Sequence, residues 1–161
     1  MYLNQHAINT PDRPAVIMAS TGKTISYSEF EGRANQLAHV FRAEGLKRLD
    51  HYSIFMENNE WYMESCAAGE RSGAYYTCVN SFLTPDELSY ILSNSRSEVV
   101  VTSTSKVHTA LAALAGAPNV RKVFVCGGVP SDISDPRVVD YTEATSAMPT
   151  TRIADESLGT P

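Results

Sequence analysis

Two glycines follow a predicted strand, at a position where a backbone loop could hold a phosphate group. The apolar segment Val123–Cys126 is followed directly by Gly127 and Gly128. Phosphate-binding loops of this kind continue with further glycines or with Gly-Lys-Ser/Thr, because several backbone N–H groups must face the phosphate oxygens. Val129 and Pro130 come next instead. We therefore interpret the glycine pair as an ordinary turn.

Adjacent carboxylates at Asp86 and Glu87 have the chemistry that general acid–base catalysis requires. They follow Thr84 and Pro85, a combination typical of the start of a helix. Acidic residues in a first turn interact favourably with the helix dipole, and Glu87 lies three residues after Thr84, as in a capping box. We interpret the pair as a helix start and not as a catalytic site.

The histidines and cysteines are too widely separated to suggest a metal site. They are His6, His39, His51, His108, Cys66, Cys78 and Cys126. An odd number of cysteines within apolar or small-residue elements is typical of reduced thiols that pack as small hydrophobic side chains. We expect no metal site and no disulfide.

Charge and length exclude several classes of protein. The 161 residues suit one domain, and 13 basic against 18 acidic residues give a net charge of −5. The basic residues form no stripe, so we expect no nucleic-acid partner. No apolar run reaches the length of a membrane span, and residues 1–6 lack the character of a signal peptide. We expect a cytoplasmic protein, with peripheral membrane association left open.

The chain opens with a predicted β-hairpin, whose strands 14–18 and 23–27 flank a turn at residues 20–22. A helix follows, for which Ser28 is the expected cap and Glu31 its capping-box partner. Apolar residues then recur every three or four positions until Gly45, which is expected to end the helix.

Beyond residue 50, short apolar strands alternate with amphipathic helices. Strands are predicted at 52–56, 74–79, 98–102 and 122–126, and helices at 59–72, from Thr84, and at 105–116. This alternation predicts an α/β fold, with a mostly parallel sheet covered by helices on both faces. We expect residues 1–128 to form this subdomain and 129–161 to be an irregular polar tail with a possible short helix near 141–147.

Small residues recur every fourth position, at Ser65, Gly69 and Gly73, along one face of the predicted helix 59–72. Such a face permits close packing of a helix on a sheet. We predict a packing role for it, and likewise for Trp61 near the start of the same helix.

Five stretches together resemble the amino-terminal part of acyl-CoA synthetases of the adenylate-forming superfamily, and in particular fatty-acid–CoA ligases. They are His6–Val16, Thr24–Ala38, Gly45–Asp50, Met56–Asn59 and, most tellingly, Gly73–Leu92. None is a catalytic signature, so the resemblance depends on their order and spacing. It covers roughly residues 6–126 and fades after Gly128.

This resemblance implies an acid–thiol ligase as the parent protein. In that reaction a carboxylic acid, such as a fatty acid, attacks ATP to form an acyl-adenylate, and coenzyme A then displaces AMP. The parent would use ATP, Mg²⁺ and coenzyme A. The family places its phosphate loop, its Thr-Glu pair, its ribose-binding Asp and its catalytic Lys beyond the segment seen here. We therefore expect a fragment without catalytic residues, cofactor or metal of its own, inactive alone, which packs on the missing subdomains and could self-associate through apolar surface that they normally cover.

One loop could take part in binding. In some relatives the third residue of the segment equivalent to Asn80, Ser81 and Phe82 is an Arg that approaches a phosphate of coenzyme A. Phe82 stands at that position here, so an ionic role cannot be transferred, and only a place on the coenzyme A side of the cleft is implied. Lys47–Asp50 also departs from the Pro-Gly-Asp turn of many relatives, without touching the chemistry.

Two other functions stay open. The chain could be a non-catalytic interaction module that complements a separate protein, or a small-ligand binder with a flavodoxin-like fold. The absence of a recognisable phosphate loop makes the second less favoured. The sequence does not define the acid, or whether the acyl acceptor is coenzyme A or a carrier protein.

Overall fold

Helix and strand alternate along most of the protein, as predicted. The computed structural model describes residues 3–157. In chain order the elements are α1 (Leu3–Asn9), β1 (Pro14–Ile17), β2 (Thr24–Ser26), α2 (Tyr27–Ala43), β3 (His51–Phe55), α3 (Glu60–Ser72), β4 (Tyr75–Cys78), α4 (Pro85–Asn94), β5 (Val99–Ser103), α5 (Val107–Ala113), a 3₁₀ turn η1 (Leu114–Gly116), β6 (Lys122–Cys126), β7 (Val138–Asp140) and α6 (Tyr141–Ser146).

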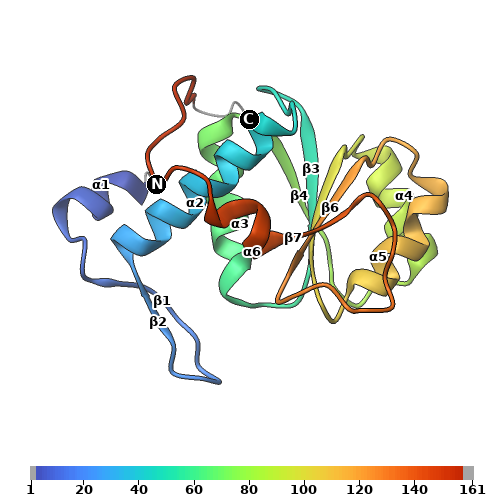
Figure 1. Ribbon diagram of the computed structural model, residues 1–161, viewed down its shortest axis with the longest axis horizontal. Coiled ribbons are helices and arrows are strands. Elements are labelled where there is room, and N and C mark those ends of the chain that lie inside the picture. Colours follow the sequence, from blue (N-terminus) through green and yellow to red (C-terminus); the bar gives the residue numbers. More distant parts are fainter. Residues whose placement is uncertain (1–2, 158–161) are drawn as a thin grey trace.

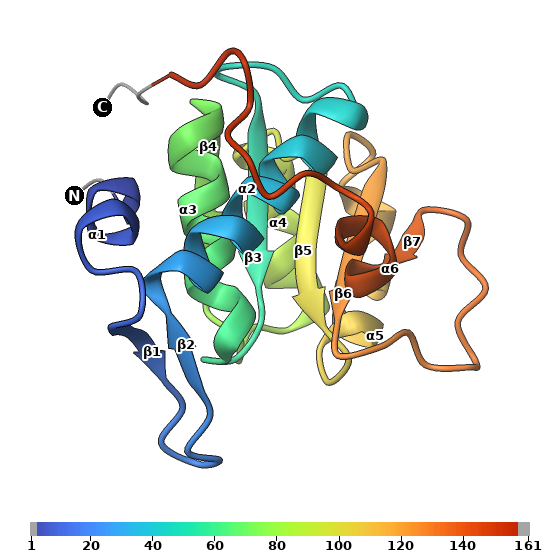
Figure 2. The ribbon, with the colours of Figure 1, turned by 60° about the vertical axis from the view of Figure 1, so that its left-hand side comes forward.

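The centre of the fold is a parallel five-stranded sheet with the order β4-β3-β5-β6-β7. Ile54 on β3 lies between Cys78 on β4 and Val101 on β5. The predicted hairpin forms a separate antiparallel pair, β1-β2, which projects from the body of the protein (Figures 1 and 2). The predicted α/β class and the hairpin are therefore confirmed.

Helices cover both faces of the sheet because side chains along each strand alternate between the two faces. On β5, Val99 and Val101 enter the core beneath α2, α3 and α6, whereas Val100 enters the core beneath α4 and α5. Such strands are buried on both sides, which explains their nearly continuous apolar sequences.

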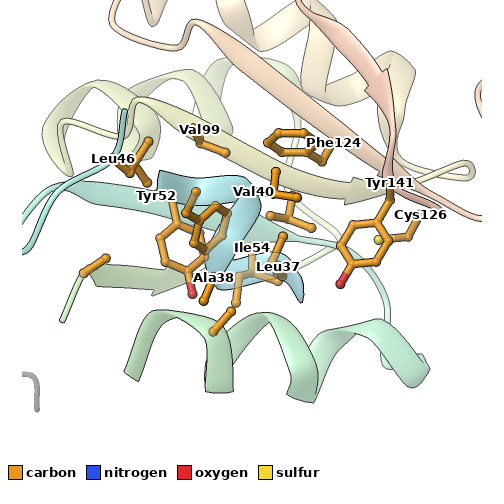
Figure 3. Packing of buried hydrophobic residues seen from close by; sticks show 14 of the residues in the cluster. Leu37, Ala38, Val40, Leu46, Tyr52, Ile54, Val99, Phe124, Cys126 and Tyr141 are labelled. Carbon is orange, nitrogen blue, oxygen red and sulfur yellow. The ribbon is translucent and has the colours of Figure 1, made fainter. Parts of the chain in front are cut away.

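The larger core lies between α2 and the sheet (Figure 3). Leu37 and Phe41 on α2 pack against Tyr52 and Ile54 on β3, and the rings of Phe41 and Tyr52 are 4.6 Å apart. Full burial of side chains of this size stabilises a fold by about 1.5–3 kcal/mol each. The apolar residues that recur every three or four positions along α2 therefore form the surface through which this helix packs on the sheet. Phe30 and Ala34 of the same helix pack against the hairpin.

Helix α3 approaches the sheet closely at Gly69, as the small-residue face predicts. A Cβ atom at this position would overlap the hydroxyl of Tyr52 and the ring of Tyr76. Gly73 then ends the helix in a left-handed conformation, with φ of 63°, which glycine adopts without steric cost.

The predicted cap of α2 is wrong. Ser26, not Ser28, is the N-cap, and its hydroxyl accepts a hydrogen bond of 3.2 Å from the backbone N–H of Glu29. Strand β2 leads directly into the helix, so Ser28 already lies in the first turn. The capping box of α4 is confirmed, because Thr84 and Glu87 bond to each other's backbone N–H groups.

Two short elements were not predicted, α1 and β7. The predicted short helix near residue 141 is confirmed as α6, but the segment before it contributes a strand, with Val139 beside Phe124 of β6. Residues beyond 128 thus extend the sheet. The division of the chain at residue 128 stays a prediction, and residues 1–2 and 158–161 lie outside the described part.

After α6 the chain crosses the outer side of α2 (Figure 2). The side-chain amide of Asn35 donates a hydrogen bond of 2.7 Å to the carbonyl of Thr150, and a ring nitrogen of His39 lies 2.8 Å from that of Thr151. Within residues 3–157, no helix has the length and apolar character that a bilayer crossing requires.

Candidate functional site

The chain changes the side on which it adds strands between β3 and β5, a place that we call the switch point. The candidate site lies there, at the carboxyl ends of the strands. From β3 the chain places β4 on one side and then β5, β6 and β7 on the other. In open parallel sheets, the loops that leave two neighbouring strands on opposite sides of such a point diverge and form a ligand-binding crevice. The loop after β3 begins at Met56 and the loop after β5 at Thr104.

The two loops meet at Glu57. Its Oε2 atom accepts hydrogen bonds of 2.6 Å from the hydroxyl of Ser103 and 2.9 Å from that of Ser105. Burial opposes the ionisation of Glu57, but the hydrogen bonds outweigh it and lower the pKa of this carboxyl below its usual value. An ionised carboxylate therefore lies at the switch point.

A cavity of about 560 Å³ opens beside Glu57, on the β4 side of the switch point. Its walls include Tyr62, Cys78 and the loop Asn80–Phe82, the only residues for which a binding role was predicted. The structure thus brings this loop and the switch point together. Its place on the coenzyme A side of a cleft stays a prediction.

The side chain of Phe82 is 89% exposed. The Oδ1 atom of Asn80 accepts a hydrogen bond of 3.0 Å from the backbone N–H of Phe82, which fixes the backbone of the loop. Ser81 between them is half-buried. The ammonium group of Lys106 lies 5.4 Å from the centre of the Phe82 ring, within the range of a cation–π contact. This position therefore combines an aromatic surface with a cation.

Sequence reasoning missed Glu57 and Lys106 as members of this site. A signal existed for Glu57, because polar residues directly after the strands of a parallel sheet gather at its carboxyl edge. Lys106 gave no such signal, since its contact with Phe82 joins loops 24 positions apart in the sequence.

Other residues with reactive side chains have structural roles or lie apart. Gly127 and Gly128 form a turn with positive φ, and the Thr104 hydroxyl donates a hydrogen bond of 2.7 Å to the carbonyl of Gly128. Within residues 3–157, no group of three or more His, Cys, Asp or Glu side chains is arranged to hold a metal ion. Trp61 packs against the larger core, as predicted.

The three cysteines differ in their surroundings. Cys126 is buried and Cys66 half-buried, and burial is the main reason that the pKa of each thiol is raised. Cys78 is exposed in the cavity wall, so the prediction that all three pack as small hydrophobic side chains is wrong for this residue. All three are free thiols.

The sequence pattern of the family described as "AMP-binding enzyme" matches residues 3–155. The chain belongs to the AMP-binding enzyme family. Over 94 residues it is 36% identical to the 3-oxocholest-4-en-26-oate–CoA ligase of Rhodococcus rhodochrous, a match that covers 58% of this chain and 17% of that protein. Over 90 residues it is 33% identical to the fatty acid–[acyl-carrier-protein] ligase ScoC of Streptomyces coeruleorubidus, covering 56% and 17%.

A solved member of similar fold is the anthranilate CoA ligase AuaEII in complex with anthranoyl-AMP. The structural match covers 98% of this chain and 28% of the AuaEII chain, with a TM-score of 0.84 and 17% sequence identity. This likeness confirms the fold predicted for an amino-terminal part of an acyl-CoA ligase. The AMP-binding match thus covers nearly the whole chain, while the chain spans only 17% of the length of the two curated relatives.

Proposed function

We propose that this chain is the amino-terminal part of an ATP-dependent, AMP-forming acyl-CoA ligase. The family match over residues 3–155 is the observation that carries this proposal. The parent would join a carboxylic acid, such as a fatty acid, to coenzyme A through an acyl-adenylate, with release of diphosphate and then AMP. In this proposal the whole enzyme binds ATP, Mg²⁺ and coenzyme A. The present chain alone does not catalyse adenylation.

The role of this part is structural, with one binding contribution. The switch-point edge, from Glu57 to the loop Asn80–Phe82, forms a wall of the cleft on the coenzyme A side. Its support is the cavity of about 560 Å³ and the exposed ring of Phe82 beside Lys106. An aromatic face next to an ammonium group suits a ligand that carries both a flat ring and phosphate groups.

Coenzyme A is the acceptor that we favour over a carrier protein. The Rhodococcus relative is named as a CoA ligase, whereas the Streptomyces relative is named as a ligase that acts with an acyl carrier protein. The CoA ligase has the higher of the two identities, 36% against 33%, which favours coenzyme A. A direct comparison of the two acceptors in the same assay decides between them.

The partners in this proposal are the further subdomains of the same enzyme, in a cytoplasmic protein. Exposed apolar side chains such as Ile8, Ile17 and Met63 lie on the described surface and support contact with such neighbours. In the isolated chain they would promote self-association. Sedimentation velocity over a hundredfold concentration range tests this, since a constant monomer mass would contradict it.

The function itself is tested with the full-length product of the gene that encodes this chain. Purified protein is incubated with a panel of carboxylic acids, ATP, Mg²⁺ and coenzyme A, and acyl-CoA and AMP are measured by mass spectrometry. We expect equal amounts of both products with at least one acid, and none when ATP is omitted. Hydrolysis of ATP to ADP, or no acyl-CoA with any acid, would contradict the proposal.

A further inference from the structure

A buried carboxyl group lies between α2, α3 and α6. Glu64 on α3 is 1% exposed. Its Oε1 atom accepts a hydrogen bond of 2.7 Å from the hydroxyl of Tyr141, the first residue of α6. Its Oε2 atom has no hydrogen-bond partner, and the nearest cationic atom is Nη1 of Arg33 on α2, at 3.8 Å. That separation is too long for a hydrogen bond.

Arg33 is held back from Glu64 by two other carboxylates. Its Nη2 atom lies 2.5 Å from Glu29, and its Nη1 atom donates a hydrogen bond of 3.3 Å to Glu60. Lys23 from the hairpin lies 2.5 Å from the same oxygen of Glu60. These two cations and two carboxylates balance each other, so an ionised Glu64 would be an additional, uncompensated negative charge.

Burial therefore raises the pKa of Glu64 to about 7, and the charge of Glu60 adds to this effect. The Tyr141 hydrogen bond and the charges of Arg33 and Lys23 oppose it. The thiol of Cys126 on β6 also faces the cluster, and burial keeps its pKa well above the usual value, so it stays neutral in this range. Within this cluster, Glu64 is thus the group whose charge changes near neutral pH.

The surroundings leave Arg33 room to move. A cavity of about 310 Å³ adjoins the cluster, and its walls include Lys23, Arg33, Glu60, Glu64 and Tyr141. A shift of the Arg33 guanidinium by about 1 Å would bring Nη1 within the 2.7–2.9 Å of a charge-assisted hydrogen bond to Glu64. Lys23 would continue to neutralise Glu60 after that shift.

We propose that Arg33 and Glu64 form a pH-sensitive switch that links the hairpin, α3 and α6. In both states the Tyr141 hydroxyl bonds to Glu64 and holds α6 to α3. With Glu64 neutral, Arg33 bonds to Glu60. With Glu64 ionised, Arg33 turns to Glu64, Glu60 is left with Lys23, and the contact between hairpin and helices changes. The switch depends on these contacts alone and is independent of the proposed enzymatic function.

The sign of the effect on stability follows from linkage. The pKa of Glu64 in the folded protein lies above its ordinary value of 4.5. The contribution of Glu64 to the stability of the fold is therefore present in full at acid pH and is lost as the pH rises through 7. For these two values the equilibrium constant of unfolding increases about tenfold between pH 6 and pH 8.

The switch itself is observed by nuclear magnetic resonance. The carboxyl carbon of Glu64 and the guanidinium nitrogens of Arg33 are followed from pH 5 to pH 9 in the whole chain. We expect both to change with a common midpoint near 7. A midpoint for Glu64 below about 5.5, or Arg33 signals that do not follow Glu64, would overturn the proposal.

Stability gives a second, separate test. Urea unfolding is measured at pH 6 and pH 8 for the wild type, for Glu64→Gln, and for the control Glu70→Gln on the exposed side of α3. The tenfold change should persist in Glu70→Gln and be absent from Glu64→Gln. Equal pH dependence in all three proteins would exclude the switch.

A third variant keeps the test valid if Glu64→Gln does not fold. Tyr141→Phe removes a hydroxyl that favours the ionised form of Glu64. The midpoint of the Glu64 titration should therefore rise above its wild-type value. An unchanged or lower midpoint would contradict the proposed arrangement.

Discussion

The hydroxyl of Tyr52 on β3 donates a hydrogen bond of 2.6 Å to the carbonyl oxygen of Ser65 on α3. This bond crosses the larger core, and both partners are buried. It satisfies a phenol that would otherwise be buried without a partner, which costs about 1–3 kcal/mol. It also fixes the distance between helix and sheet, because Gly69 lies one helical turn beyond Ser65 and rests against the same tyrosine.

Gly69→Ala should therefore destabilise the protein. The new methyl group would overlap the Tyr52 hydroxyl and the Tyr76 ring, and α3 would have to move away from β3. We expect a loss of about 2 kcal/mol or more in the free energy of unfolding, as for other overpacked cores. Urea denaturation followed by circular dichroism measures it.

Gly32→Ala is the matched control. Gly32 also lies within a helix, α2, but a Cβ atom there would meet only Thr150, at an ordinary distance of 3.5 Å. Alanine is the better helix former by about 1 kcal/mol, so this variant should be as stable as the wild type or more stable. Equal losses in both variants would show that close packing at Gly69 is not the cause.

The cap of α2 is tested by a pair of serine variants. Ser26→Ala should cost about 1 kcal/mol of unfolding free energy, because the N–H of Glu29 loses its partner. Ser28→Ala should cost less than about half as much, since Ser28 is within the first turn. A larger loss for Ser28→Ala would restore the cap that the sequence alone suggested.

The proposed role of the loop Asn80–Phe82 in coenzyme A binding is tested in the full-length protein. Phe82→Ala should raise the KM for coenzyme A severalfold and leave the KM for ATP unchanged, since the ring is proposed to contact only the acceptor. Stability should change by less than about 0.5 kcal/mol, because the side chain is exposed. Tyr90→Ala, another exposed aromatic residue at 70%, serves as control. Equal kinetic effects of both substitutions would refute the assignment.

The switch-point carboxylate gives a prediction for acid pH. The pKa of Glu57 is lowered in the fold, so its contribution to stability is present at neutral pH and is lost as the pH falls through that pKa. Ser103→Ala removes one of the hydrogen bonds responsible. We expect it to lose about 1 kcal/mol of unfolding free energy at pH 7 and less at pH 3.

The control for this prediction is Ser93→Ala, at an exposed position of α4. It should change stability little at either pH. If Ser103→Ala lost the same free energy at pH 3 as at pH 7, the hydrogen bond to an ionised Glu57 would not be its cause.

Most of the fold could be predicted because its elements carry local signals. The capping box at Thr84 and Glu87 and the turn glycine Gly45 after α2 depend only on neighbouring residues. Strand β7 has just three residues and exists through its pairing with β6, which no local pattern reveals. The local sequence does not identify the cap of α2, because Ser26 and Ser28 are equally good cap residues and the end of β2 decides between them.

The sites were less predictable, because they depend on contacts between distant segments. The loop Asn80–Phe82 is indicated only by a family resemblance, whereas the pKa of Glu57 is lowered by hydrogen bonds from Ser103 at the end of β5 and Ser105 in the loop after it. Glu64 lies in an amphipathic helix where an acidic residue normally faces solvent. Glu64 is buried because α6 packs over it. Tyr141 of α6, which donates the hydrogen bond to Glu64, lies 77 positions away in the sequence.

The central claim is that this part of an AMP-forming ligase supports the cleft but does not perform adenylation. Acid-dependent exchange of labelled diphosphate into ATP tests it most directly, with the chain of 161 residues and the full-length gene product assayed side by side. We predict exchange by the full-length protein, and none above the buffer control by the chain alone. Acid-dependent exchange by the chain alone would contradict the account.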